Sequence, residues 1–501
     1  MQTEASGFAG RRPAAGKDRT RMELVKNIFL TCGNRIPGIP VRKTAGFLKP
    51  GISERTRQDG ALREMILLML PMILSNILQQ FYNTVDALVI GRFADQEAFA
   101  AVGIASAVMN LFTFLIAGAC SGISVIFSQY YGRKNMAAFR NEHFLTAIFG
   151  TAGSVLLAAG GILLLNPLLR LMRVDAALLP YVRSYLSIVL AGLPAVFLYN
   201  LYSAMLRSIG RTSAILLILF VSVGCNLALD LFLVRDLSLG IRGAAAATAA
   251  AEGLSALLGI LYGVLFERQI LFRRGDIRLN GARLKATWSM AFVTGLHHSG
   301  LYIGKLGVQA VVNTAGISAV AAYTASTRIE GFANSFGDSA TEAESVLTAQ
   351  RFGAGDERGI RRMSRASFCT TVFLGITCSV LLFLTAGPAS AFLLGNSGEA
   401  SVRACADYLR VVSLFYLFDF TGSTYAGYFN GIGRVRIPFL GAAMHITLRV
   451  ILSVLLVPHF GLPAVAAATG IGWVYANLFW LLIKKKVRPR EAVSSCRRKL
   501  P

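Results

Sequence analysis

The sequence predicts an all-α membrane protein with twelve transmembrane helices in two six-helix lobes, related by a parallel pseudo-two-fold repeat. Three observations lead to this fold class. The apolar residues fall in long blocks, Lys and Arg gather in alternate loops, and the second half of the chain repeats motifs of the first.

The apolar blocks identify lipid as the solvent of this chain. Of its 501 residues, 54% are hydrophobic and 15% are charged, whereas soluble domains carry about 25% charged residues. Blocks of roughly 20 to 30 residues can cross about 30 Å of hydrocarbon at about 1.5 Å per residue. We therefore expect spans near residues 62–90, 98–128, 139–165, 181–205, 212–234, 243–266, 288–313, 318–349, 367–394, 405–429, 438–457 and 462–483.

The distribution of Lys and Arg sets the orientation. The positive-inside rule places the rich loops, and both termini with them, in the cytoplasm. This requires an even number of spans, as twelve is. The rich set contains Arg133, Lys134, Arg140, Arg207, Arg211, Arg268, Arg273, Arg274, Arg278, Arg283, Lys285, Arg351, Arg358, Arg361, Arg362, Arg365, Arg434, Arg436 and the C-terminal tail, and the poor set contains Arg92, Arg170, Arg173, Arg235, Arg242 and Arg403.

The two halves repeat each other at an offset of about 221 residues. Residues 129–132 match 350–353, residues 207–211 match 430–434, and residues 240–248 match 461–469. Because six spans separate the copies, both halves have the same orientation. Transporters with such a parallel repeat place their substrate between the halves.

The repeat divides the chain into five parts. Residues 1–60 are polar, basic and rich in Gly and Pro, which predicts a disordered cytoplasmic tail. The remaining parts are an N-lobe at 61–266, a cytoplasmic inter-lobe loop at 267–287, a C-lobe at 288–483 and a basic cytoplasmic tail at 484–501.

Several function classes lack the motifs that they require. The net charge of +24 comes without a nucleic-acid-binding motif. The sequence has no phosphate-binding loop and no nucleophile elbow. The adjacent His297 and His298 cannot both face one metal ion from a helix. We therefore expect no enzyme, no nucleic-acid partner, no metal and no cofactor beyond a coupling ion.

Polar residues inside the apolar blocks are the candidates for chemistry, because an intramembrane carboxylate usually marks an ion path. Gln79, Tyr82 and Asp86 have the i, i+3, i+7 spacing of one helix face, and Asn226 and Asp230 share a face of the fifth span. Such acids suit an exchangeable proton and suit Na⁺ equally. The alternatives are a solvated acid at the membrane interface for Asp86 and a helix-packing hydrogen bond for the other pair.

The chain resembles a multidrug and toxic compound extrusion (MATE) transporter over residues 62–483. Each motif is weak alone, but together, in order and duplicated, they are specific. The motifs are residues 81–92, 98–103, 129–132, 207–211, 226–230 and 240–248. The resemblance implies two six-helix lobes and antiport driven by an ion gradient through alternating access.

The resemblance also implies which residues bind the coupling ion. Asp86, Asn226, Asp230 and Thr248 match an Asp, an Asn, an Asp and a Thr that form a polar site in the N-lobe of such transporters. Tyr82 and Asn200 match positions that line the adjoining cavity. With Gln79 they are expected to line the substrate cavity here.

The second lobe carries a mixed set of charges. Lys305 lies in the middle of the seventh span, Asp338 and Glu342 lie in the eighth, and Asp419 lies in the tenth. We expect Lys305 to pair with one of these acids, and the sequence does not choose the partner. The acid that the resemblance implies in the seventh span is absent, so neutralisation of Lys305 is favoured over a cation site. Glu330 and Glu344 also lie in the eighth span, and His445 and Arg449 lie in the eleventh.

The leading hypothesis is a secondary antiporter that exports amphipathic organic cations in exchange for H⁺ or Na⁺. We expect a multi-pass monomer in the bacterial inner membrane with both termini in the cytoplasm. The alternative is a lipid-linked or polysaccharide flippase of the same superfamily. A membrane enzyme or scaffold is the third class. The missing catalytic constellation argues against an enzyme, and the repeat with buried acids argues against a scaffold.

Overall fold

The computed structural model describes residues 54–486, except 94–95, 173 and 396–397. Most of both predicted tails lies outside these residues. Helix α2 (Glu54–Phe93) begins before residue 61, where the N-lobe was expected to start. Every regular element among the described residues is helical.

The helices follow the expected order of spans. In the N-lobe they are α2, α3 (Gln96–Gly132), α4 (Met136–Leu163), α5 (Leu165–Leu171), α6 (Leu179–Ala191), α7 (Leu193–Ser208), α8 (Thr212–Asp230), the π-helix η1 (Leu231–Asp236) and α9 (Gly240–Phe266). The short helices η2 (Arg268–Ile270) and η3 (Arg274–Asp276) lie in the inter-lobe loop. The C-lobe contains α10 (Gly281–Asn313), α11 (Ile317–Ala354), α12 (Glu357–Leu394), α13 (Glu399–Ser413), α14 (Tyr416–Gly431), α15 (Arg436–Phe460) and α16 (Leu462–Lys486).

Two spans are broken, and counting each as one gives twelve spans among the described residues. Helices α6 and α7 are bent by 43° at their junction. Pro194 follows Gly192 there and cannot donate the backbone hydrogen bond that a continuous helix needs. Helices α13 and α14 are separated by Leu414 and Phe415.

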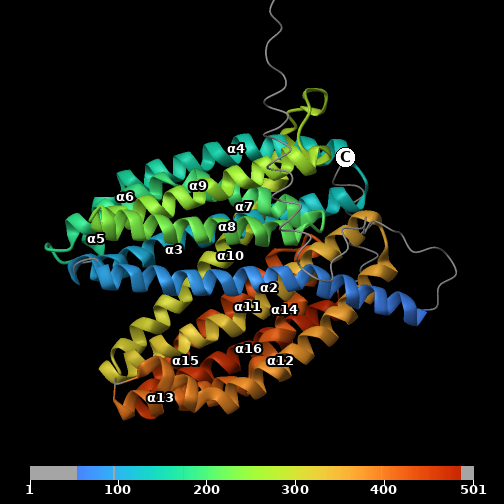
Figure 1. Cartoon of the computed structure of the whole chain (residues 1–501). Coiled ribbons are helices and arrows are strands. Elements are labelled where there is room, and N and C mark those ends of the chain that lie inside the picture. Colours follow the sequence, from blue (N-terminus) through green and yellow to red (C-terminus); the bar gives the residue numbers. More distant parts are fainter. Residues whose placement is uncertain (1–53, 94–95, 173, 396–397, 487–501) are drawn as a thin grey trace, which may run out of the picture. The chain divides into compact units, whose positions relative to one another are not determined.

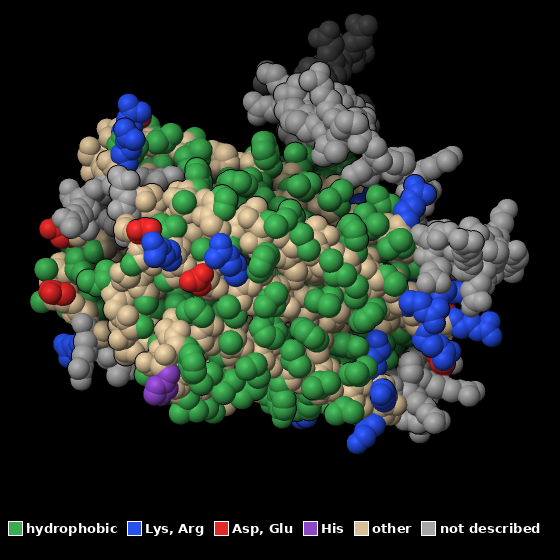
Figure 2. Space-filling view, turned by 90° about the horizontal axis from the view of Figure 1, so that it is seen from below, with side chains coloured by type: hydrophobic (Ala, Val, Ile, Leu, Met, Phe, Trp, Pro, Cys, Tyr) green, Lys and Arg blue, Asp and Glu red, His purple; other side chains and the backbone are tan. Residues whose placement is uncertain are grey.

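Hydropathy alone finds fewer spans than the structure. Eight described helices are long and apolar enough to cross a membrane, or nine with the bent pair α6–α7. Helices α10 and α11 do not pass this test, because polar residues such as Lys305 and Asp338 lie within them. Helices α13 and α14 are 15 and 16 residues long, and each alone is too short to pass. Figure 2 shows hydrophobic side chains over the middle of one face, with Lys and Arg gathered mainly toward one end.

The internal repeat is visible in the backbone. Lys134 follows α3 with a φ of 59°, and Gly355 follows α11 with a φ of 73°. The next residues cap the next helices in the same way. The Asn135 side chain accepts from the Ala138 N–H at 3.0 Å, and the Asp356 side chain accepts from the Gly359 N–H at 2.8 Å. The motif matches therefore reflect a shared local structure.

The lobes exchange part of their first helices. Helices α4–α9 lie on one side and α11–α16 on the other, with α2, α3 and α10 at the boundary (Figure 1). The first half of α2 packs Met65 and Met69 into a core with Met363 of α12 and residues of α11. Conversely, the Thr287 hydroxyl of α10 donates to Glu142 of α4 at 2.6 Å. Each lobe is therefore anchored to the other by the helix that opens it.

Candidate functional site

The polar pair on α8 lies in the interior of the N-lobe. Asn226 and Asp230 are each 1% exposed. Neither atom of the Asn226 side-chain amide has a hydrogen-bond partner among the described residues. A buried amide without partners is costly, so this amide is available to a polar ligand, to water or to a side chain outside the described part of the structure.

Hydrogen bonds between α8 and α9 set the register around this pair. The Ser222 hydroxyl donates to the Ala251 carbonyl at 2.6 Å, and the Ser255 hydroxyl donates to that of Ser222 at 2.5 Å. Because the two helices are antiparallel, Asn226 then lies about level with Thr248. The Thr248 hydroxyl donates to the carbonyl of Ala244 on its own helix at 3.0 Å, which leaves its oxygen able to accept or to coordinate.

The other N-lobe candidates lie on α2 and α7. Gln79 and Tyr82 are half-buried on α2, and Asp86 is on the same helix with its side chain outside the described part of the structure. The Asn200 side chain on α7 donates to the Val196 carbonyl at 2.8 Å. These residues come from the helices expected to surround the predicted site.

Glu252 of α9 was not predicted as a site residue. It lies one helical turn from Thr248, and its Oε2 atom is buried without a hydrogen-bond partner among the described residues. The available signal was an acid four residues after Thr248 within an apolar span.

In the C-lobe, Lys305 does not form the expected close ion pair. Its side chain is exposed, and no carboxylate among the described residues lies within the 4.0 Å of an ion pair. Asp338 and Asp419 lie within its electrostatic range. Lys305 shares a face of α10 with Tyr302, whose ring stacks on Phe114 of α3 at 5.4 Å. That face is turned toward the N-lobe.

A second C-lobe cluster surrounds Glu330 of α11. The Tyr408 hydroxyl donates to Glu330 at 3.1 Å. The Arg449 guanidinium donates to the Tyr323 hydroxyl at 3.4 Å, and it lies within electrostatic range of Glu330. Sequence reasoning noted Glu330 and Arg449 but not the tyrosines, because nothing in a single sequence distinguishes these from core aromatic residues.

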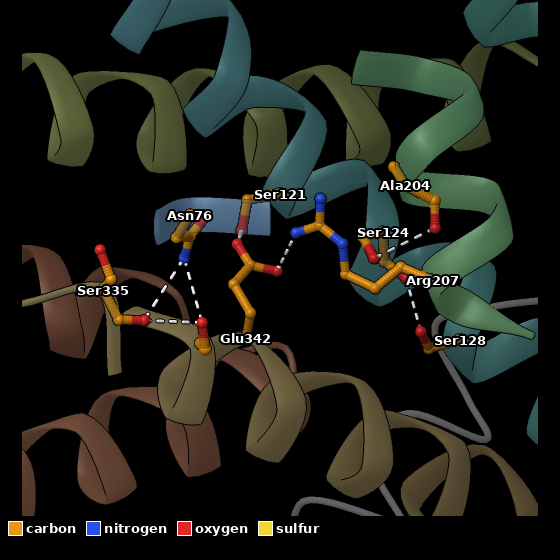
Figure 3. A network of polar contacts seen from close by, with 9 residues as sticks. Asn76, Ser121, Ser124, Ser128, Ala204, Arg207, Ser335 and Glu342 are labelled. Atoms are coloured by element: carbon orange, nitrogen blue, oxygen red, sulfur yellow. Dashed lines mark hydrogen bonds and ion pairs between the residues drawn. The ribbon is translucent and has the colours of Figure 1, made fainter. Parts of the chain in front are cut away.

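Glu342 of α11 contacts the opposite lobe (Figure 3). Its carboxylate accepts from the Arg207 guanidinium of α7 at 2.6 Å and from the Ser121 hydroxyl of α3 at 2.7 Å. On the same side of α11, the Asn76 amide of α2 donates to Ser339 at 3.0 Å. Glu342, expected in a network around Lys305, is thus part of a link between the lobes.

Further along α3 and α11 than the Ser121–Glu342 contact, the two lobes meet in a nearly symmetric way. The Gln129 side chain of α3 donates to the Gly431 carbonyl of α14 at 3.2 Å, and the Gln350 side chain of α11 donates to the Ser208 carbonyl of α7 at 2.8 Å. These are equivalent positions in the repeat. We call the contacts of Gln129, Gln350, Arg207 and Glu342 the seam.

Two glycines bring the helix ends together at the seam. A Cβ atom at Gly132 would lie 1.9 Å from the Gln350 carbonyl oxygen, and one at Gly353 would lie 2.1 Å from the Gln129 carbonyl oxygen. Only a residue without a side chain allows such an approach. The ends of α3, α7, α11 and α14 that form the seam lead into loops of the set that is rich in Lys and Arg.

The inter-lobe loop is fastened to the N-lobe beside the seam. Arg140 of α4 forms an ion pair with Asp276, and Asn141 accepts from the Arg278 N–H at 2.9 Å. The hydrogen bond from Arg140 lowers the pKa of Asp276 below its usual value of 3.8.

This contact predicts how the loop responds to pH. Because the folded-state pKa of Asp276 is lowered, the anchoring is complete above about pH 4 and is lost as the pH falls through the folded-state pKa. We expect Asp276→Asn to loosen the loop already at neutral pH. A nitroxide label at Leu279, which is 76% exposed, should show higher mobility in this variant. Equal mobility at pH 7 in both proteins would contradict the anchoring role.

Two repeated helical lobes, buried polar residues in the spans and a polar seam between the lobes define a multi-pass membrane transporter. A sequence profile described as MatE matches residues 71–232 and 300–455. The match covers more than half of the chain, which therefore belongs to the MatE family.

Individual relatives have low sequence identity to this chain, but the aligned regions are long. The chain is 26% identical to "Probable multidrug resistance protein YpnP" of Bacillus subtilis over 309 residues, covering 60% of this chain and 68% of the relative. It is 23% identical to "Multidrug export protein MepA" of Staphylococcus saprophyticus over 447 residues, covering 87% and 96% of the two chains.

Solved structures share the fold. A structure described as the outward-facing conformation of a multidrug resistance MATE family transporter superposes with a TM-score of 0.80 at 20% identity, covering 87% of this chain and 96% of the other. A crystal structure of MATE in complex with MaL6 gives a TM-score of 0.80, also at 20% identity, covering 87% and 97%. The twelve-span, two-lobe architecture is the common feature.

Proposed function

We propose that this transporter exports amphipathic organic cations, drugs among them, in exchange for H⁺ or Na⁺ by alternating access. The observation that carries the proposal is the seam. The lobes meet there through one ion pair and reciprocal hydrogen bonds, which water can replace when the lobes separate. The names of the relatives YpnP and MepA support drugs as substrates.

The orientation of the cycle follows from charge. The seam lies at the end with the Lys- and Arg-rich loops, which the positive-inside rule assigns to the cytoplasm together with both termini. In bacteria this is the inner membrane. The present conformation is therefore closed toward the cytoplasm.

The ion step belongs to the N-lobe. An ion bound near Asp86 and Asp230 from outside neutralises the carboxylates that hold a cationic substrate, so the substrate leaves. Ion release on the cytoplasmic side restores the charge, and a new substrate binds. The buried Asn226 amide supplies a further oxygen ligand for Na⁺, or a donor and an acceptor for a proton relay.

The test is ethidium efflux from proteoliposomes under an imposed proton gradient and then an imposed Na⁺ gradient. We expect one gradient to drive efflux in the wild type, and Asp86→Asn to reduce efflux to the level of empty liposomes because its amide cannot exchange charge. The control is Asp175→Asn, at an exposed turn acid outside the spans, which should export normally.

Failure of the wild type under both gradients, with the protein folded and inserted, would favour the flippase. One observation gives that alternative weight: the exposed ammonium of Lys305 on the α10 face that turns toward the N-lobe suits an anionic headgroup. Efflux by Asp86→Asn at the wild-type rate would instead support the export hypothesis and contradict a role for Asp86 in ion coupling.

A further inference from the structure

Glu252 lies in the interior of the N-lobe and does not face lipid. In α9 it shares a helix face with Thr248 and Gly259, at i−4 and i+7. A Cβ atom at Gly259 would lie 3.1 Å from Tyr202 of α7, so this face is turned toward α7. The neighbouring stripe of α9 contacts Ser222 of α8. Glu252 is half-buried, and its buried Oε2 atom therefore lies between α7, α8 and α9.

Four other glutamates of the described spans differ from Glu252 in one respect. Each of them accepts a hydrogen bond: Glu142 from Thr287, Glu330 from Tyr408, Glu342 from Arg207 and Ser121, and Glu344 from Thr348. No hydrogen bond to Glu252 is formed by any described residue, and its Oε2 atom is buried. An ionised carboxylate there has no donor to replace water.

The titratable groups on the helices packed against α9 do not neutralise an ionised Glu252 carboxylate. Tyr199 of α7 lies close enough to Glu252 to sense its charge. Arg207 lies two turns further along α7 and is paired with Glu342. Asp230 lies on α8, Cys120 lies on α3, and the Asp86 side chain of α2 is outside the described part. None of the ion pairs among the described residues includes Glu252. A bound proton is the ligand that neutralises an isolated carboxylate without requiring a partner.

We propose that Glu252 is a second proton-binding carboxylate of the N-lobe, protonated while the seam is closed and deprotonated when the seam opens. The proposal rests on the proposed ion-coupled export. On opening, the carboxylic O–H bond breaks and the proton passes to water, which leaves the carboxylate. On return, a proton from the outer side restores the acid.

The exit path is a polar stripe on α7. Tyr199, Ser203 and Arg207 follow each other at four-residue spacing, and Tyr199 hydrogen-bonds Ser203. Arg207 ends the stripe at the seam, where it binds Glu342. Opening the seam thus brings water to the end of a path that begins beside Glu252.

The direct test is the infrared difference spectrum of the full-length protein in nanodiscs between acidic and alkaline pH. A protonated carboxylic acid has a carbonyl band that an amide lacks. We expect Glu252→Gln to remove part of this band, and the matched control Glu142→Gln, a buried acid held by Thr287, to leave that component in place. An unchanged band in Glu252→Gln overturns the proposal.

A second measurement uses ethidium as the probe. In weak buffer with a pH indicator, wild-type protein should release protons when ethidium binds, and Glu252→Gln should release fewer per bound ethidium. If Glu252→Gln does not fold by gel filtration and thermal melting, Glu252→Asp serves instead. Its acid band must shift relative to wild type, and an unshifted band overturns the proposal.

The outcomes separate this inference from the proposed function. Ethidium export by the wild type together with an unchanged band in Glu252→Gln removes Glu252 and keeps cation export. A wild type that exports nothing removes cation export, while the infrared band still decides whether Glu252 binds a proton.

Discussion

Alanine at Gly132 is expected to abolish export while leaving the protein folded in the membrane. The added Cβ would lie 1.9 Å from the Gln350 carbonyl oxygen and 2.6 Å from its carbon. Backbone atoms cannot yield as a flexible side chain can, so the ends of α3 and α11 must separate. The seam would then stay open, and a transporter that cannot close one side cannot complete the cycle.

The equivalent glycine of the second half, Gly353, allows the same substitution experiment, and Gly103 on α3 provides a control. Gly353→Ala should have the same effect, because its Cβ would lie 2.1 Å from the Gln129 carbonyl oxygen. Gly103→Ala, on the same helix as Gly132, meets nothing within 4 Å. It should be neutral or slightly stabilising, since alanine favours helix over glycine by about 1 kcal/mol.

The readouts are ethidium efflux and the distance between spin labels at Ala137 and Arg358. These exposed residues occupy equivalent places in the first turns of α4 and α12. We expect a longer distance in both seam variants and a wild-type distance in Gly103→Ala. Normal efflux by Gly132→Ala with an unchanged distance would show that the seam is not a gate.

The fold was predictable because its determinants are local or periodic. Apolar blocks predict most spans, and turns such as those at Lys134 and Gly355 keep their geometry in both halves. A threshold on mean hydropathy alone misses α10 and α11, where residues such as Lys305 and Glu342 lower the mean, although spans at 288–313 and 318–349 were predicted from their apolar blocks. Those polar faces are stable because they meet the other lobe, and a single sequence does not show what a face will meet.

The candidate site was predictable only in part, for a related physical reason. Asn226 and Asp230 stand out because polar residues in an apolar helix are costly. Arg207 did not stand out as a site residue, because it was counted among the loop cations that set the orientation. In the structure its side chain is 20% exposed and paired with Glu342. Charge counting cannot separate a solvated loop arginine from one that bridges two lobes.

Neutralising either partner of the Arg207–Glu342 pair is expected to shift the lobes toward the open seam. Removing one member of a buried pair costs roughly 3–5 kcal/mol. These side chains are 20% and 19% exposed, so we reduce the expectation to about 2 kcal/mol, or roughly 30-fold in the ratio of closed to open seam. Glu342→Gln and Arg207→Gln should each show this shift in the label distance between positions 137 and 358.

The double variant Arg207→Gln with Glu342→Gln distinguishes two causes of the shift: the loss of the ion pair itself, and the cost of the partially buried charge that a single variant leaves unpaired. Two amides of similar size can hydrogen-bond each other, and neither leaves a buried ion unpaired. The double variant should therefore lie closer to wild type than either single variant. The control is Glu399→Gln, which breaks an ion pair with Arg403 in which both side chains are more than 70% exposed. Such pairs contribute little, so an equal shift in this control would mean that the distance reports net charge and not the seam.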